Sequence, residues 1–237
     1  MSVYVLIHGA WQGSWCWDKI VPLIEKEGHT VQSPDLPGHG NDKTPIPEIS
    51  LQAYADRVCD ILDAQSEPVV LVGHSMGGVV TTQAAEYRPD KVKILVYLAA
   101  FLLQNGEFLL QYGEPDKDSL VLPNLIMSED QSFATIKEEV VKAAFYGDCS
   151  DEDVERARSL LVPQASAPLA TPVSTSKDNF GSLPRIYISC SRDRVISPSI
   201  QEKMYRYLPC EKVIQMDTSH SPFFSAPEEL AKHLLSI

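Results

Sequence analysis

Residues 68–78 read PVVLVGHSMGG, and this stretch decides the fold. The run PVVLV consists almost entirely of β-branched and leucine side chains, which is typical of a buried strand in a parallel sheet. The pattern G-x-S-x-G follows in residues 73–77, before an alanine-rich stretch that predicts a helix to about Arg88. A sharp turn between strand and helix lifts the serine hydroxyl above the sheet, and the flanking glycines leave room for that turn. The spacing therefore predicts that Ser75 is a nucleophile.

Apolar runs on both sides of this stretch extend the pattern to a whole sheet. Strands are expected at residues 2–9, 29–35, 68–75, 93–100, 185–190 and 212–217. Helical patterns separate these strands, and the helix capped by Ser50 has its apolar side chains at helical spacing. Strands that alternate with helices and are apolar throughout form parallel sheets covered on both faces. The sequence predicts an α/β protein built on a mostly parallel, six-stranded sheet with helices on both faces.

The alternation of strands and helices stops between residues 101 and 181. Short helices are expected there at 131–145 and 151–161, between proline-rich and polar loops. The segment holds 14 Asp and Glu residues against 6 Lys and Arg residues, so it carries most of the net charge of −12. We therefore predict a helical cap, residues 101–181, inserted into a core made of residues 1–100 and 182–237.

The composition fits one globular domain and argues against several kinds of partner. The chain has 237 residues, of which 44 % are hydrophobic and 22 % are charged, which is too apolar for a disordered chain. Its net charge of −12, without a Lys/Arg cluster, disfavours nucleic acid and anionic membranes as partners. Five cysteines without a C-x-x-C pair favour free thiols in a reducing compartment, and no apolar run is long enough to span a bilayer. No signal peptide is recognisable, so we expect a cytoplasmic protein.

A nucleophilic serine needs a base, and the base needs an acid that orients it. His220 is the candidate base, because it alone among the histidines lies in a loop after a late strand. The others are interpreted as packing, hydrogen-bonding, loop, turn or surface residues: His8, His29, His39, His74 and His233. Asp193 follows the preceding strand and would approach the imidazole from a neighbouring position in the sheet, so it is the preferred acid. Asp217 is the alternative, although it belongs to the same strand end as the histidine.

Attack on a carbonyl also needs two backbone N–H groups aimed at the developing oxyanion. Met76 supplies one, because it follows the nucleophile at the start of a helix. The second is expected from the loop after the first strand, where residues 8–11 read HGAW. Gly9 lets this loop pass close to Ser75, and the Ala10 amide is the predicted donor.

The chain resembles the α/β-hydrolases, and within them the esterase group that includes plant methylesterases and hydroxynitrile lyases. The resemblance rests on LIHGAWQGSWCW (6–17), DLPGHG (35–40), GHSMGG (73–78), FYGDCSDEDVERARSLLVPQ (145–164) and DTSHSPFFSAPEELA (217–231). Bacterial carboxylesterases that hydrolyse pyrethroid-type esters have a similar stretch after the histidine. The resemblance implies an α/β-hydrolase fold with a cap, no metal or organic cofactor, and the homodimers frequent in the family. It also implies a catalytic triad and an oxyanion hole at Ser75, Asp193, His220, Ala10 and Met76.

The predicted function is hydrolysis of small to medium neutral carboxylic esters, apolar or aromatic, through an acyl-enzyme. The predicted substrate pocket contains Gly9, Trp11, Phe101, Leu125, Phe145, Ser221 and Phe223. Two alternatives stay open: a hydroxynitrile lyase that uses the same triad, and a small-molecule receptor with slow turnover. Lyases of this group carry Thr or Asn at the position of Gly9, and one subgroup carries Lys where this chain has Ser221. These differences favour hydrolysis.

Overall fold

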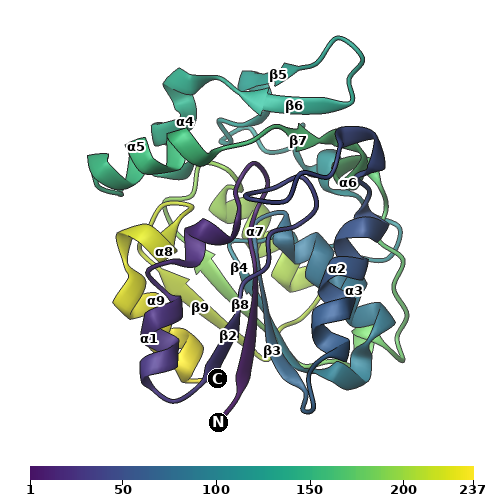
Figure 1. The fold of residues 1–237 in the computed structure, drawn as a ribbon. Coiled ribbons are helices and arrows are strands. Elements are labelled where there is room, and N and C mark those ends of the chain that lie inside the picture. The colour runs from purple at the N-terminus through teal and green to yellow at the C-terminus, as the bar shows by residue number, and fades with distance from the viewer.

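The computed structural model describes residues 1–237, and its central feature is a six-stranded sheet (Figure 1). The order of strands across the sheet is β2-β1-β3-β4-β8-β9. Their bounds are β1 (Val3–Ile7), β2 (Thr30–Gln32), β3 (Val69–His74), β4 (Val92–Leu98), β8 (Arg185–Cys190) and β9 (Lys212–Met216). Every neighbouring pair is parallel, so the carboxyl ends of all strands meet at one edge of the sheet. The predicted α/β fold with a parallel sheet is confirmed.

Helices cover both faces of this sheet, as the sequence predicts (Figure 1). The core helices are α1 (Val21–Lys26), α2 (Leu51–Asp63), α3 (Gly77–Tyr87), α7 (Pro198–Tyr207), α8 (Pro222–Ser225) and α9 (Pro227–Leu235). In Figure 1, α1 and α9 flank one side of the sheet, and α2 and α3 pack together on the other side. The Ser50 hydroxyl caps α2 by accepting the Ala53 N–H at 3.0 Å. No helix has both the length and the apolarity that crossing a bilayer requires.

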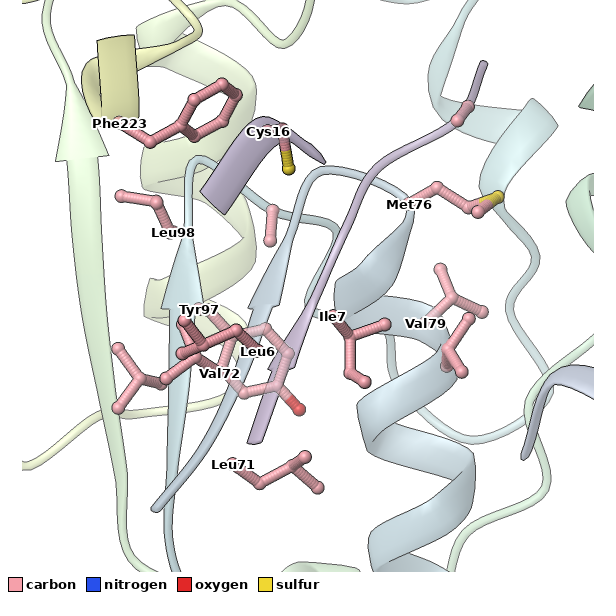
Figure 2. Close-up of a cluster of buried hydrophobic side chains, with 14 of the residues drawn as sticks. Leu6, Ile7, Cys16, Leu71, Val72, Met76, Val79, Tyr97, Leu98 and Phe223 are labelled. Atoms are coloured by element: carbon pink, nitrogen blue, oxygen red, sulfur yellow. The ribbon is translucent and has the colours of Figure 1, made fainter. Parts of the chain in front are cut away.

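One hydrophobic core lies between the sheet and its helices and continues into residues 101–181. Every residue of β3 is buried, and Figure 2 shows Leu71 and Val72 of this strand among side chains from β1, β4 and α3. Val141, Val154 and Leu169 belong to the same cluster of buried side chains. Burial of apolar surface stabilises the fold by about 25 cal/mol per Å². Core and cap therefore share one apolar interior.

The two chain ends lie side by side where the parallel strands begin (Figure 1). The Tyr4 hydroxyl, on β1, donates to the Leu234 carbonyl of α9 at 3.1 Å and joins the two terminal elements. Both ends are thus at the opposite edge of the sheet from the strand ends that Ser75 follows.

Residues 101–181 form helices and a small second sheet above the carboxyl edge of the main sheet (Figure 1). In chain order the elements are β5 (Leu125–Met127), β6 (Phe133–Ile136), α4 (Glu138–Phe145), α5 (Asp151–Leu160), β7 (Gln164–Ala165) and α6 (Ser166–Ala170). The three strands pair antiparallel in the order β5-β6-β7. Single 3-10 turns lie at Ser14–Trp17, Ile46–Glu48, Pro89–Lys91, Leu109–Tyr112, Leu122–Asn124 and Phe180–Ser182.

The prediction of one helix over residues 131–145 is wrong in its first half. Gln131 has a left-handed φ of +58°, and Asp130 Oδ1 accepts the Ser132 N–H at 3.1 Å, so this stretch is a turn. Residues Phe133–Ile136 then form β6, and the helix begins only at Glu138. Aromatic and β-branched side chains favour a strand when a partner strand is present, and β5 is that partner. The helix predicted at 151–161 is confirmed as α5.

Candidate active site

Ser75 follows β3 at the carboxyl edge of the sheet and occupies a strained turn. Its φ of +55° lies in the left-handed region, which costs a non-glycine residue about 1–3 kcal/mol. The Gly78 N–H donates to the Ser75 carbonyl at 3.1 Å and helps to hold this turn. A Cβ at Gly73 would lie 2.6 Å from the Gly77 carbonyl oxygen, and one at Gly77 would lie 2.7 Å from the His8 carbonyl oxygen. Backbone contacts therefore require both glycines of the motif.

His220 and Asp193 form a buried pair in the loops after β9 and β8. His220 Nδ1 lies 2.8 Å from Asp193 Oδ2, and both side chains are at most 1 % exposed. Asp193 Oδ1 accepts the N–H groups of Val195 and Ile196 at 2.7 and 3.1 Å. Gln201, on α7, donates its side-chain amide to Asp193 Oδ2 at 2.9 Å. These donors suit an ionised carboxylate and fix its orientation toward the imidazole.

His220 Nε2 is buried and makes no hydrogen bond within the protein. Because Nδ1 faces an acceptor, the proton of the neutral imidazole belongs on Nδ1 and the lone pair on Nε2. Ser75 Oγ and Nε2 are not hydrogen-bonded to each other in this structure, and such catalytic contacts often tighten only when substrate binds. Nε2 is therefore free to accept a proton.

Asp217, the alternative acid, makes no contact with the imidazole and instead supports the histidine loop. Its side chain is 85 % exposed and lies 3.2 Å from Arg192 Nε. Arg192 also pairs with Asp148 of the cap at 3.2 Å. Asp148 in turn accepts both the N–H of Ser219, at 2.8 Å, and the hydroxyl of that residue. Asp148 lies within the stretch 145–164, but nothing in the sequence of that stretch indicates which loop its carboxylate contacts.

Ala10 and Met76 line the same cavity as Ser75, and the N–H group of neither residue donates to a protein acceptor. Buried N–H groups are nearly always paired, so two unpaired amides beside one hydroxyl form an unusual arrangement. Gly9 brings the first of them close, because a Cβ there would lie 2.9 Å from Ser75 Cβ and 3.1 Å from His74 Nδ1. The close approach that the sequence predicts for Gly9 is present.

The cap holds the loop after β1 from above through Trp11. This residue has a left-handed φ of +62°, and its carbonyl accepts the Val162 N–H at 2.9 Å. Its indole N–H donates to the Ala134 carbonyl at 2.9 Å, and its backbone N–H donates to Gln164 Oε1 at 3.4 Å. Gln164 is fully buried and also lies 3.0 Å from His39 Nε2. Gln164 ends the stretch 145–164 that carries the family resemblance, but nothing in the sequence of that stretch indicates the partners of its side chain.

A cavity of about 650 Å³, including its opening to solvent, lies above Ser75. Hydrophobic residues make up 13 of the 17 that line it. Trp11 forms part of the wall on the core side, and Phe101, Leu109 and Leu125 belong to the cap side. Three of the predicted pocket residues, Trp11, Phe101 and Leu125, therefore line this cavity.

The other four predicted pocket residues do not line the cavity, and each is used elsewhere. Gly9 lies against the side chains of Ser75, Gln12 and His74 and has no side chain of its own to present to the cavity. Phe145 packs edge-on against His220, with ring centroids 6.0 Å apart. Ser221 is fully buried behind the histidine, and Phe223 is fully buried in the hydrophobic core (Figure 2). Apolarity and position after the histidine are not sufficient to place a side chain in the pocket.

Comparison with known proteins identifies the family of this chain. A sequence model described as the alpha/beta hydrolase family matches residues 4–233. The chain belongs to the α/β hydrolase family. The matched residues of this α/β hydrolase include the ends of β3, β8 and β9, which Ser75, Asp193 and His220 follow.

Relatives of this α/β hydrolase include esterases from bacteria and plants. The pyrethroid hydrolase of Sphingobium wenxiniae is 33 % identical, over 96 % of this chain and 84 % of its own. Methylesterase 9 of Arabidopsis thaliana is 31 % identical, over 100 % of this chain and 98 % of its own. The crystal structure of a polyneuridine aldehyde esterase matches with a TM-score of 0.90 at 26 % identity, covering 100 % of this chain and 98 % of that chain. These relatives are carboxylesterase-type hydrolases, so the resemblance seen in the motifs is confirmed.

Buried histidines surround the site of this α/β hydrolase. Burial lowers the pKa of His8 to about 3 and holds the pKa of His74 well below that of a free imidazole. His8 Nε2 accepts the Leu36 N–H at 3.1 Å, and His74 Nε2 lies 2.9 Å from the His220 carbonyl oxygen. Burial also lowers the pKa of His39, which is 1 % exposed although its sequence position suggested a turn. These three histidines are neutral hydrogen-bonding groups at neutral pH.

Proposed function

We propose that the protein is a serine carboxylic-ester hydrolase whose catalytic triad is Ser75, His220 and Asp193. The observation that carries the proposal is the meeting, at one apolar cavity, of the strained Ser75 with the unpaired amides of Ala10 and Met76. The buried pair of His220 and Asp193 supplies the base. Relatives named pyrethroid hydrolase and methylesterase support the same type of reaction.

In the first half of the reaction, His220 Nε2 accepts the proton of Ser75 Oγ while this oxygen attacks the ester carbonyl. The carbonyl oxygen becomes an oxyanion, which receives hydrogen bonds from the Ala10 and Met76 amides. His220 then donates its proton to the leaving oxygen as the C–O bond breaks. The alcohol leaves, and the acyl group remains bound to Ser75 Oγ. Asp193 stabilises the transient imidazolium and keeps its orientation.

Water completes the reaction by the same sequence. His220 Nε2 accepts a proton from the water as its oxygen attacks the acyl carbonyl, and the same two amides hold the second oxyanion. The proton then returns to Ser75 Oγ as the acid leaves. Each of these steps uses only side chains and backbone amides of this chain.

The wall of the cavity favours neutral substrates of small to medium size with apolar or aromatic groups. Each Å² of apolar surface that a substrate buries there contributes about 25 cal/mol. The excess of acidic residues in the cap, 14 against 6 basic, disfavours anionic substrates at the opening. Methyl esters and pyrethroid-type esters, suggested by the names of the relatives, are the first classes to test.

The geometry at Gly9 argues against cyanohydrin cleavage. A side chain at this position would begin 2.9 Å from Ser75 Cβ, so the Thr or Asn of the lyases would force the backbone to shift. Ser221 is fully buried and neutral, so it offers no counter-charge to a departing cyanide. Ester hydrolysis needs neither group.

The five cysteines are all free thiols, which favours a reducing compartment. We therefore include a cytoplasmic location in the proposal. A homodimer is proposed from the family resemblance alone. The proposed partner in the reaction is a small-molecule ester, and the net charge of −12 disfavours nucleic acid and anionic membranes.

The test is a panel of methyl, acetyl and longer-acyl esters, with mandelonitrile, assayed on the wild-type and Ser75→Ala proteins. We expect steady hydrolysis of at least one ester, its loss in Ser75→Ala, and no cyanide release above the uncatalysed rate. Cleavage of mandelonitrile faster than every ester would replace the hydrolase by a lyase. A single burst of product from a chromogenic ester, without turnover, would favour a receptor.

A further inference from the structure

The cavity above Ser75 is lined by one charged side chain, Asp116, which no proposed step uses. Asp116 lies in the cap and is only 8 % exposed. Its Oδ2 accepts the Ser197 N–H at 2.8 Å, whereas its Oδ1 is buried without a hydrogen-bond partner. No basic side chain forms an ion pair with it. A carboxylate at the wall of an apolar cavity therefore has one buried oxygen without a donor.

Neighbouring hydroxyl groups of the cavity do not supply that donor, because their protons are engaged elsewhere. Ser119 Oγ donates to the Val195 carbonyl at 2.8 Å. The Tyr112 hydroxyl donates to Glu107 Oε2 at 2.8 Å. Asp116 Oδ1 therefore receives no hydrogen bond from these hydroxyl groups.

One oxygen is sufficient for the structural role of Asp116. Oδ2 accepts the N–H of the residue that precedes α7, where a negative charge is favourable. The second oxygen lies in apolar surroundings, and an unpaired buried acceptor there costs free energy. A substrate that donates a hydrogen bond removes this cost, whereas an apolar substrate of the same shape leaves it in place. The same carboxylate repels an anionic substituent.

We propose that Asp116 is a specificity-determining residue that selects esters with a hydrogen-bond donor remote from the scissile carbonyl. The donor is a hydroxyl or a protonated amine on an otherwise apolar substrate, since an ionised carboxylate only accepts. This inference rests on the proposed ester hydrolysis and narrows its substrate class from apolar esters to apolar esters with one donor.

The test uses methyl esters of linear acids of increasing chain length, each ending in methyl, hydroxyl or ammonium. We expect the ratio of kcat/KM for the hydroxyl ester to that for its methyl isostere to peak at one chain length, at about ten-fold or more. Asp116→Asn keeps an acceptor for the Ser197 N–H but removes the charge. We therefore expect the ratio of kcat/KM between donor and methyl esters to fall in this variant, most strongly for the ammonium esters. Asp118→Asn removes the same charge from an exposed position on the same loop and leaves the ratios unchanged.

Two results overturn the inference while the proposed function stands: hydrolysis that favours the methyl ester at every chain length, or a donor preference that persists in Asp116→Asn. If no ester of any series is hydrolysed, the proposed function fails instead. The inference is then decided by titration calorimetry of the Ser75→Ala protein with the same ester pairs. Equal affinities for donor and methyl esters at every length overturn it.

Discussion

The core side and the cap side of the active site are built by different means. On the core side, Ser75, Asp193 and His220 follow the ends of parallel strands, and glycines without room for a Cβ fix the turn of the nucleophile. On the cap side, residues 101–181 contribute apolar side chains from loops, short helices and a three-stranded antiparallel sheet. The candidate catalytic groups are thus placed by backbone geometry, and the shape of the cavity is set by side chains.

The core side and the cap side of the site also differ in solvent exposure. The candidate triad is almost completely buried, with relative exposures of 5 % for Ser75 and 1 % for both Asp193 and His220. The cap instead exposes large apolar side chains, namely Leu110, Leu122, Ile126, Met127 and Leu160. A substitution on the core side therefore disturbs packed neighbours, whereas many positions on the cap side meet only solvent or substrate.

Removal of a reacting group on the core side has the largest expected effect. Ser75→Ala and His220→Ala each lower kcat by about 10⁴–10⁶, because the triad acts as a unit. Leu125→Ala, which trims the cap wall of the same cavity, lowers kcat/KM by about ten-fold or less. Kinetics on a chromogenic ester measure both, with circular dichroism to check folding. Equal losses of kcat/KM in Leu125→Ala and Ser75→Ala would show that the cap side contributes as much to the rate as the core side.

A further prediction on the core side concerns which aspartate, Asp193 or Asp217, acts as the acid beside His220. Asp193→Asn is expected to lower kcat by about 10⁴, because an amide no longer holds the imidazole in the required tautomer. Asp217→Asn, an exposed change on the neighbouring loop, keeps a rate near that of wild type. Steady-state kinetics of the two variants show which of the two aspartates is the acid. The opposite ranking would move the acid to Asp217.

Buried histidines make the core side sensitive to acid. The folded-state pKa values of His8, about 3, and His74 lie below the unfolded value of about 6.5, so protons favour the unfolded chain. Stability is fully present above about pH 6.5 and is lost as the pH falls toward the folded values. The two groups together lower the free energy of unfolding by about 3 kcal/mol between pH 6.5 and 5. Urea unfolding measures this loss, and His233→Gln is the control that retains it.

Matched glycine substitutions compare the backbones of the two sides. Gly77→Ala places a Cβ 2.7 Å from the His8 carbonyl oxygen and should cost about 2–3 kcal/mol of unfolding free energy. Gly113→Ala, in the cap, meets no heavy atom closer than 3.4 Å and should change stability by about 0.5 kcal/mol or less. Thermal or chemical unfolding measures both. Similar costs would mean that the cap backbone is as tightly fixed as the core.

The hydrogen bonds of Gln164, which link the cap to the loop after β1, have an expected effect on both stability and rate. Gln164→Ala leaves the Trp11 N–H without its acceptor and should cost about 1–3 kcal/mol of stability. It also loosens the residue next to the Ala10 amide, so kcat should fall by about ten-fold. Gln104→Ala, an exposed change in the same cap, is the control and leaves both quantities unchanged. A stability loss without any fall in kcat would show that the link serves folding alone.

The sequence predicts the core side well, because its signals are local. Continuous apolar runs predict the strands, and the G-x-S-x-G spacing between a predicted strand and a predicted helix points to the turn at Ser75. The cap is predicted less well, because its elements depend on distant contacts. The strand at Phe133–Ile136 needs β5 as its partner, and the role of Gln164 depends on Trp11, which is 153 residues away in sequence. The spacing of apolar residues in a single sequence does not show which distant residues pair.

The adjacency of the chain ends has a practical consequence. The Tyr4 hydroxyl already joins the first strand to the last helix, so a short linker between the ends would turn the chain into a ring. A ring of this kind can be reopened at a surface loop, which makes circular permutation possible without touching the catalytic strand ends. Fusion partners, or a support attached at either end, would likewise lie at the edge of the sheet opposite the strand end that Ser75 follows.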